Sequence, residues 1–163
     1  MPSSPPRPWV RFWARGVDST VAALIFERTA PLLGIPLTSW SDFAVMWTGF
    51  IVWIPLEAIS MTATGTTPGK WLLRVSVTPR MNFATSLNRA VQVVLKGMCG
   101  AIPLIGLIMM YKSYKRLSAR GITNWDESVG LAVTHETIGP LRIAATALIT
   151  ALSFLLPALG IIR

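Results

Sequence analysis

Two long apolar runs dominate the pattern of hydrophobic and polar positions. The run at 43–63 holds a single ionisable residue, Glu57, and the run at 141–162 carries no charge after its second residue. A helix that crosses a bilayer needs about 20 mostly apolar residues, and both runs reach that length. We therefore expect two spanning helices here, the second as an extra C-terminal transmembrane helix within 136–163.

Two further segments have the length of a membrane helix but not its uniformity. The segment at 12–33 has a short apolar centre and contains Asp18, and we expect it to span. The segment at 91–111 contains glycines and Pro103, which interrupt helices. Non-helical backbone at membrane depth is tolerated only where protein or a wet cavity covers it. We predict a broken re-entrant or interfacial helical hairpin at 91–111, with a spanning helix kinked at Pro103 as the alternative.

A different period marks two short stretches between these segments. Residues 71–78 and 128–135 alternate apolar and other positions, which is a strand pattern. A lone strand would leave its backbone groups unpaired, so each is the expected partner of the other. The predicted fold is an all-α membrane protein with three spanning helices, the broken hairpin and a small two-stranded β-ribbon on the cytoplasmic side. The Pro/Ser-rich residues 1–8 are expected to be disordered.

Composition supports the membrane class. The chain of 163 residues is 52% hydrophobic and only 13% charged, about half the charged fraction of an average soluble domain. Lys and Arg number 15 against 7 Asp and Glu, giving a net charge of +8. These basic residues stand in blocks between the apolar runs, an arrangement that orients membrane proteins, and not on one polar face as in a nucleic-acid binder.

The basic blocks predict an orientation. Arginines precede the first segment, and the loop at 64–90 is basic, whereas 34–42 has no basic residue. The N-terminus and the 64–90 loop should therefore be cytoplasmic and 34–42 external. A re-entrant 91–111 keeps the basic stretch at 112–120 cytoplasmic as well. We expect these loops to contact anionic lipid headgroups, and several copies of so small a chain to be needed to enclose a path.

The sequence lacks the residues that disulfides, zinc sites, nucleotide-binding loops and common catalytic sites require. Cys99 is the only cysteine and His135 the only histidine, so neither an internal disulfide nor an ordinary zinc site is expected. Gly65, Gly69 and Lys70 do not have the spacing of a nucleotide-binding P-loop. No pair of nucleophile and base stands out. We expect no enzyme activity, cofactor or metal, and no nucleic-acid partner.

Asp18 is the most informative polar residue, because an isolated carboxylate at the bilayer centre costs about 2.5–3.5 kcal/mol. Arg11 and Arg15 lie seven and three positions earlier, close to one helix face. They predict either a structural ion pair within the helix or a polar site for a cation, a proton or a substrate. Glu57, near the inner end of its helix, should lie at a similar depth. There the two carboxylates could hold a cation or share a proton, or each could simply pair with a basic residue.

Four stretches resemble the RDD family of bacterial membrane proteins. "RFWARGVDSTVAAL" resembles the family's opening, with Arg11 and Asp18 in the named positions and Arg15 as an accessory. "LEAISMTATGTTPGKWLLRVSV" is similar to its most specific stretch, and "SLNRAVQVVLKG" to a further segment. "NWDESVGLAVT" supplies the second aspartate, Asp126. The resemblance covers 9–135, and it departs from the family at Trp125, where a histidine is usual.

The resemblance implies a multi-pass protein of the bacterial inner membrane with a role in transport of a small cation or solute. The implied site lies near the cytoplasmic leaflet and comprises Arg11, Asp18, Glu57 and Asp126, supported by Arg15, Gly69, Lys70 and Arg89. Two alternatives stay open. One is a non-catalytic membrane scaffold or accessory subunit with a structural Arg/Asp network, and the other a lipid-binding protein whose basic loops hold anionic headgroups.

Overall fold

The computed structural model describes residues 7–97 and 103–158. These form helices joined to one small sheet, as the sequence predicts. The elements in chain order are α1 (Pro8–Thr29), the 3₁₀ turns η1 (Pro31–Leu33) and η2 (Leu37–Ser39), α2 (Asp42–Thr64), α3 (Pro68–Leu72), β1 (Val75–Thr78), α4 (Phe83–Gln92), the π-helical η3 (Val93–Gly97), α5 (Pro103–Arg120), α6 (Asn124–Glu127), β2 (Ala132–His135) and α7 (Pro140–Ala158).

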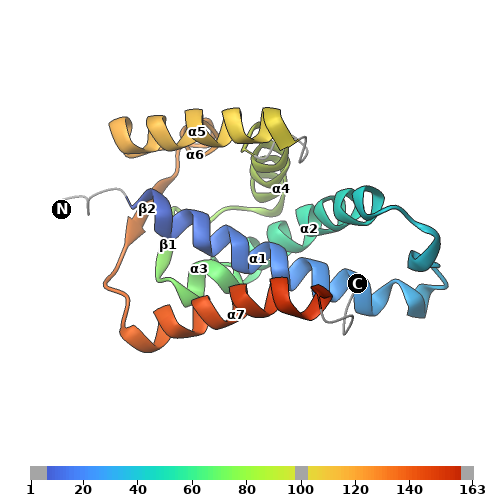
Figure 1. Ribbon diagram of the computed structural model, residues 1–163. Coiled ribbons are helices and arrows are strands. Elements are labelled where there is room, and N and C mark those ends of the chain that lie inside the picture. The colour runs from blue at the N-terminus through green and yellow to red at the C-terminus, as the bar shows by residue number, and fades with distance from the viewer. Residues whose placement is uncertain (1–6, 98–102, 159–163) are drawn as a thin grey trace.

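Helix α1 is the central element of the arrangement. It lies between α5 on one side and α7 on the other, and α2 and α3 also pack against it (Figure 1). It begins at Pro8 and ends at Thr29, a few residues earlier at both ends than the predicted 12–33. Pro8 lies in the first turn, where its missing N–H costs nothing. The chain then leaves the helix through η1, which ends at the left-handed Gly34.

Helix α2 follows the predicted apolar run closely. Its N-cap is Ser41, whose hydroxyl accepts from the backbone N–H of Ala44 over 3.2 Å, and it ends at the left-handed Gly65. Among the described residues, Phe43–Thr64 is the one helical segment both long and apolar enough to cross a membrane, and Pro140–Leu152 is apolar but shorter. The spans predicted at 12–33 and 141–162 therefore remain predictions.

The segment at 91–111 falls in more than one element. Helix α4 ends at Gln92, η3 continues to Gly97, and α5 begins at Pro103 with a different direction (Figure 1). The middle of the predicted hairpin, 98–102, lies outside the described residues, as do 1–6 and 159–163. Helix α5 runs on to Arg120, past the predicted end at 111. The basic stretch at 112–120 consists largely of residues that favour a helix, which explains the extension.

The two predicted strands pair with each other. Strands β1 and β2 are antiparallel, with Val75 opposite His135 and Val77 opposite Val133. Both strands are shorter than the alternating pattern at 71–78 and 128–135 suggested. Trp71 and Leu72 instead end the short helix α3. The inward valines pack against side chains of α1, α2 and the loop before β2, so the sheet holds distant parts of the chain together.

Helix α7 is fixed to α3 through its first turn. The Nη1 of Arg142 donates to the carbonyl oxygens of Trp71 and Leu72 over 2.6 and 3.2 Å. The guanidinium also lies 4.9 Å from the centre of the Trp71 ring, which adds a cation–π contact. The extra C-terminal helix therefore belongs to the same packed unit as the helices before it.

Candidate functional site

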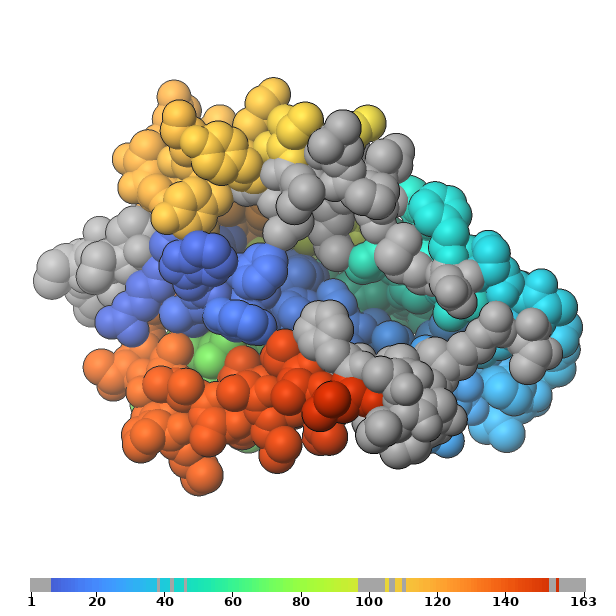
Figure 2. Space-filling view, viewed as in Figure 1, coloured from blue at the N-terminus to red at the C-terminus, as the bar shows by residue number. Residues whose placement is uncertain are grey.

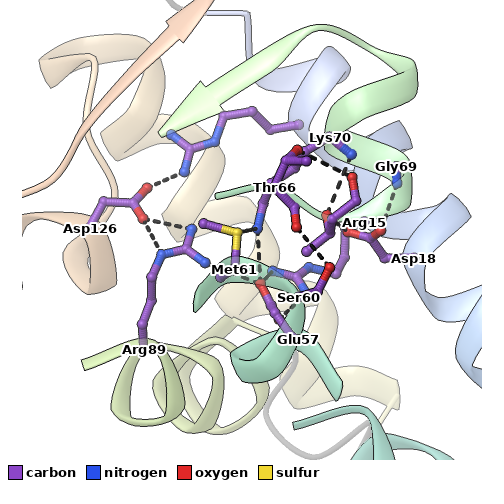
Figure 3. Close-up of polar contacts among 12 residues, drawn as sticks. Arg15, Asp18, Glu57, Ser60, Met61, Thr66, Gly69, Lys70, Arg89 and Asp126 are labelled. Carbon is purple, nitrogen blue, oxygen red and sulfur yellow. Dashed lines mark hydrogen bonds and ion pairs between the residues drawn. The ribbon is translucent and has the colours of Figure 1, made fainter. Parts of the chain in front are cut away.

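A charged cluster of seven side chains lies at the centre of the fold, where α1, α2, α3, α4 and α6 meet (Figure 3). It contains three carboxylates and four cations, all with distant partners: Asp18, Glu57, Asp126, Arg11, Arg15, Lys70 and Arg89. The three carboxyl-bearing residues are 0–1% exposed. Charged groups are rarely buried so completely unless they are paired, and each of these carboxylates has more than one donor.

Glu57 is the centre of the cluster. Arg15 donates to both of its oxygens, over 2.6 Å from Nη1 and 3.1 Å from Nη2. Lys70 donates from Nζ over 3.0 Å, and Arg89 donates from Nη1 over 3.1 Å. One carboxylate thus joins three cations from three different helices. A buried carboxylate with this many charged donors is held ionised.

Asp126 is the second meeting point, at the other side of Arg89. Arg89 donates from Nε over 2.9 Å while its Nη1 reaches Glu57, so one guanidinium bridges the two carboxylates. Arg11 also donates to Asp126, and the Thr123 hydroxyl donates over 2.6 Å. Burial alone would raise the pKa of Asp126. Arg89, Arg11 and Thr123 outweigh burial and lower that pKa to about 2.

Asp18 has a different kind of partner. Its Oδ2 accepts from the Thr67 hydroxyl and its Oδ1 from the Gly69 backbone N–H, both over 2.7 Å. The predicted ion pair of Asp18 with Arg11 or Arg15 is therefore wrong. Those long side chains reach past the helix to Asp126 and Glu57, whereas the short Asp18 side chain faces α3. Asp18 and Glu57 consequently have separate hydrogen-bond partners, although the charges of Arg15 and Lys70 act on both carboxylates.

Gly69 allows α3 to approach α1 at very short range. A Cβ placed on Gly69 would lie 2.0 Å from the carbonyl oxygen of Ala14 and 3.0 Å from Oδ1 of Asp18. Thr67 is the N-cap of α3, and its hydroxyl oxygen accepts from the Lys70 backbone N–H over 3.5 Å while donating to Asp18. The stretch Thr67–Lys70 therefore wraps the Asp18 carboxylate with backbone and side-chain donors.

Lys70 is the member of the charged cluster that lies in α3. Its ammonium lies 3.0 Å from Oε1 of Glu57 and 3.3 Å from Sδ of Met61 (Figure 3). Burial lowers the pKa of Lys70 to about 8, although Glu57 opposes that shift. The cationic form at neutral pH therefore depends on the pairing with Glu57.

A cavity of about 600 Å³ adjoins the cluster, bounded by α1, α5 and the sheet. Figure 2 shows α1 at the surface between α5 and α7, so the central helix is not covered on this face. The cavity wall combines two kinds of side chain. The charged part consists of Arg11, Arg15, Asp18, Lys70 and Arg89, and the aromatic part of Trp9, Phe12, Tyr111, Tyr114 and Trp125.

The cluster has a surplus of one positive charge, since four cations meet three carboxylates. Arg11 also has one N–H donor group without an acceptor in the described part of the chain. Its Nη2 binds Asp126, but its buried Nη1 has no hydrogen-bond partner among the described residues. In the same part of the chain, no group of three or more His, Cys, Asp or Glu side chains is placed to hold a metal ion.

Comparison with known protein families gives a match that includes every residue of the charged cluster. The family model described as the RDD family matches residues 5–126, well over half of the chain. The chain belongs to the RDD family. Family membership, together with the apolar α2, indicates a membrane protein. Comparisons with curated proteins and with solved structures give no significant match.

All eight residues of the site implied by the RDD resemblance lie in or against the charged cluster. The second aspartate, Asp126, meets the named Arg11 although the two are 115 positions apart. The sequence alone singles out neither Thr67, which lies inside the second RDD-like stretch, nor Thr123. Both had a signal, because each stands directly before a short helix, and Thr123 begins a T-x-x-D pattern of the capping-box kind. Trp125, where the family usually has histidine, lines the cavity.

Proposed function

We propose that this RDD protein takes part in moving a small solute across the bacterial inner membrane through the cavity beside the charged cluster. The cavity is the observation that carries the proposal. Its volume of about 600 Å³ is within the usual range of small-molecule sites, about 300–1,000 Å³. Its wall also has the composition of such sites, with apolar and aromatic side chains and a few convergent polar groups.

The charges of the cluster favour a solute over a cation. A metal or alkali cation needs oxygen ligands, yet the carboxylates of Glu57 and Asp126 are engaged by Arg and Lys side chains. Asp18 lies at the cavity but already accepts from Thr67 and Gly69. The cluster's surplus of one positive charge further opposes binding of a metal or alkali cation.

In this proposal the chain is a multi-pass protein with α1, α2 and α7 crossing the membrane and 91–111 re-entering it. The N-terminus and the 64–90 loop are cytoplasmic, which places the cluster near the inner leaflet and its basic loops at anionic headgroups. One copy supplies few helices around a path, so several copies form the transport unit.

Single-cysteine labelling in intact cells tests this topology in a Cys99→Ser background. Ser39→Cys should react with a membrane-impermeant maleimide from outside, while Asn88→Cys and Ser118→Cys should react only after permeabilisation. All three positions are exposed on the protein surface. External labelling of Ser118→Cys would show that 91–111 spans and would remove the re-entrant part of the proposal.

A scaffold is the second candidate, favoured by a specific observation. Each carboxylate of the cluster is satisfied by protein donors, as expected of a network that only holds helices together. Such a protein would act as a non-catalytic accessory subunit. Its charged cluster would have no solute, and the cavity would be a by-product of packing.

Reconstituted liposomes distinguish the two functions. Wild type, Asp18→Asn and the control Glu27→Gln, which lies on the same helix outside the cluster, are compared for thermal stability. The same liposomes are assayed for cation-driven proton flux with an entrapped dye and for uptake of labelled phosphate and octyl phosphate. Flux in wild type that Asp18→Asn loses at retained stability supports transport. Absence of every flux, with stability lost in Asp18→Asn, supports the scaffold.

A further inference from the structure

The wall of the cavity is asymmetric in charge. Four cations of the cluster line it, but only one of the three carboxylates, Asp18, does so. Glu57 and Asp126 lie behind their basic partners and not at the cavity wall. A bound cation would therefore face mostly like charge, whereas a bound anion would face a surplus of opposite charge.

Arg11 contributes a donor as well as a charge. Its Nη2 binds Asp126, and its Nη1 is buried without a hydrogen-bond partner among the residues described. A buried N–H without an acceptor is costly in a protein interior, and the few that occur call for an explanation. An anionic oxygen in the cavity that Arg11 lines would supply the missing acceptor.

The rest of the wall is suited to hydrocarbon. Trp9 packs its ring 6.0 Å from Phe12 and 5.8 Å from Tyr114, so one aromatic surface runs from α1 to α5. Valines of the sheet and of η3 complete the apolar part. Trp and Tyr are also the residues that concentrate at the level of lipid headgroups. The apolar and cationic parts meet within one cavity.

From this pairing we infer that the cavity binds an amphipathic anion, a phosphate or carboxylate headgroup joined to an apolar chain. The headgroup lies at Arg11 and the neighbouring cations, and the chain lies along Trp9, Phe12 and Tyr114. This ligand is the solute class of the proposed transport site, so the inference rests on that function. A membrane phospholipid and a soluble amphiphile both have this chemistry.

Gly16 permits a test that leaves the cluster intact. It lines the cavity, and a Cβ placed on it would meet no atom within 4 Å. Gly16→Leu therefore fills the cavity without removing a charge. Gly49→Leu is the matched control, because Gly49 is inside a helix, also has no atom within 4 Å of a Cβ, and does not line the cavity.

Calorimetric titration of the full-length protein in a neutral sugar detergent measures binding without any transport. Four ligands are compared: dihexanoyl phosphatidylglycerol, dihexanoyl phosphatidylcholine, octyl phosphate and inorganic phosphate. Phosphatidylglycerol should bind at least tenfold more tightly than phosphatidylcholine with the same chains. Octyl phosphate should bind at least tenfold more tightly than inorganic phosphate. Gly16→Leu should lower the affinity for both amphiphiles by tenfold or more, and Gly49→Leu should leave both affinities unchanged.

The source of the ligand follows from the two amphiphiles. Tighter binding of phosphatidylglycerol assigns the site to a bilayer lipid, and tighter binding of octyl phosphate assigns it to a soluble anion. Equal binding of the zwitterionic lipid, equal binding of inorganic phosphate, or undiminished binding by Gly16→Leu overturns the inference. A protein that binds amphipathic anions but moves no solute loses only the transport proposal, and one that moves other solutes without binding them loses only this inference.

Discussion

Gly69 donates its backbone N–H to Oδ1 of Asp18 over 2.7 Å, and this contact joins a five-residue helix to the middle of a long one. It explains how an acidic residue is tolerated in the first apolar segment. Asp18 is solvated by the chain itself, through one amide and one hydroxyl, in a place that a larger residue than glycine would block.

Gly69→Ala should destabilise the protein by about 3 kcal/mol, because atoms added to a fully packed site force backbone shifts that cost about 1–3 kcal/mol and occasionally more. The added Cβ would lie 2.0 Å from the Ala14 carbonyl oxygen, and backbone must shift to relieve it. Thermal unfolding in detergent measures the effect. Gly49→Ala is the control, since its Cβ meets open space, and it should be neutral or stabilising. Equal melting temperatures for the two variants would contradict the close approach of α3 to α1.

Thr67→Val should cost about 1–3 kcal/mol, the usual penalty for a buried polar group that loses its partner. Valine keeps the shape of threonine but cannot donate to Asp18 or cap α3. Thr67→Ser keeps the hydroxyl and should remain within about 1 kcal/mol of wild type. Denaturant titration of both variants checks this order. If serine and valine are equally harmful, the hydroxyl is not the important group.

Arg89 and Asp126 should show strong energetic coupling. Removing one partner of a buried ion pair costs about 3–5 kcal/mol, because the other charge is left unpaired. Arg89→Gln and Asp126→Asn should each be severe, and the double variant should be less harmful than the sum by about 1–3 kcal/mol. The exposed pair Arg74 and Glu136, 3.3 Å apart, is the control and should couple by about 1 kcal/mol or less. Additive effects at Arg89 and Asp126 would contradict the bridge.

His135 should make the folded protein sensitive to mild acid. Burial, with Arg11 and Arg7 nearby, lowers the pKa of this imidazole to about 4 from an ordinary value of 6.5. Between these values the unfolded chain binds the proton and the folded chain does not. Stability is therefore fully present above pH 6.5 and decreases as pH falls to 4, by about 1–2 kcal/mol once solvent screening of this incompletely buried group is allowed for.

Melting temperatures between pH 7 and pH 4 measure this dependence. His135→Gln cannot take up the proton, so its stability should change much less over that range. Glu136→Gln, the neighbouring exposed residue, should keep the wild-type decrease. An identical decrease in His135→Gln and wild type would assign the acid sensitivity to another group.

The pattern of apolar and polar residues predicted the type of element well where no second local signal, such as a helix cap, competed with it. The alternation around Val75 and Val133 predicted strands, and the need to pair their backbones identified each as the partner of the other. The strand boundaries were less accurate, because Thr67 and Pro68 start a helix that takes Trp71 and Leu72 out of the strand. The N-cap at Thr67 starts a helix that runs into a stretch whose apolar alternation predicts a strand, and the alternation alone does not show that the helix forms.

The members of the charged cluster were predictable, but their pairing was not. Charged residues in or beside apolar segments must find partners, so Arg11, Asp18 and Glu57 could be singled out. Spacing along one helix then suggested that Arg11 and Arg15 pair with Asp18. The actual choice depends on side-chain reach across the packing of separate helices, which brings Arg11 to Asp126 over 115 positions. Only the three-dimensional arrangement contains that information.

The span of the cluster along the chain also has a consequence for biosynthesis. Arg11 leaves the ribosome long before Asp126 exists, and at about 5–20 residues per second the delay is on the order of ten seconds. Throughout that time Arg11 has no final partner. The partners of Arg15 and Asp18 lie no later in the chain than Gly69 and are translated within about half of that delay. If α1 crosses the membrane as proposed, the Arg11 guanidinium needs water or another shield from lipid until Asp126 has been translated.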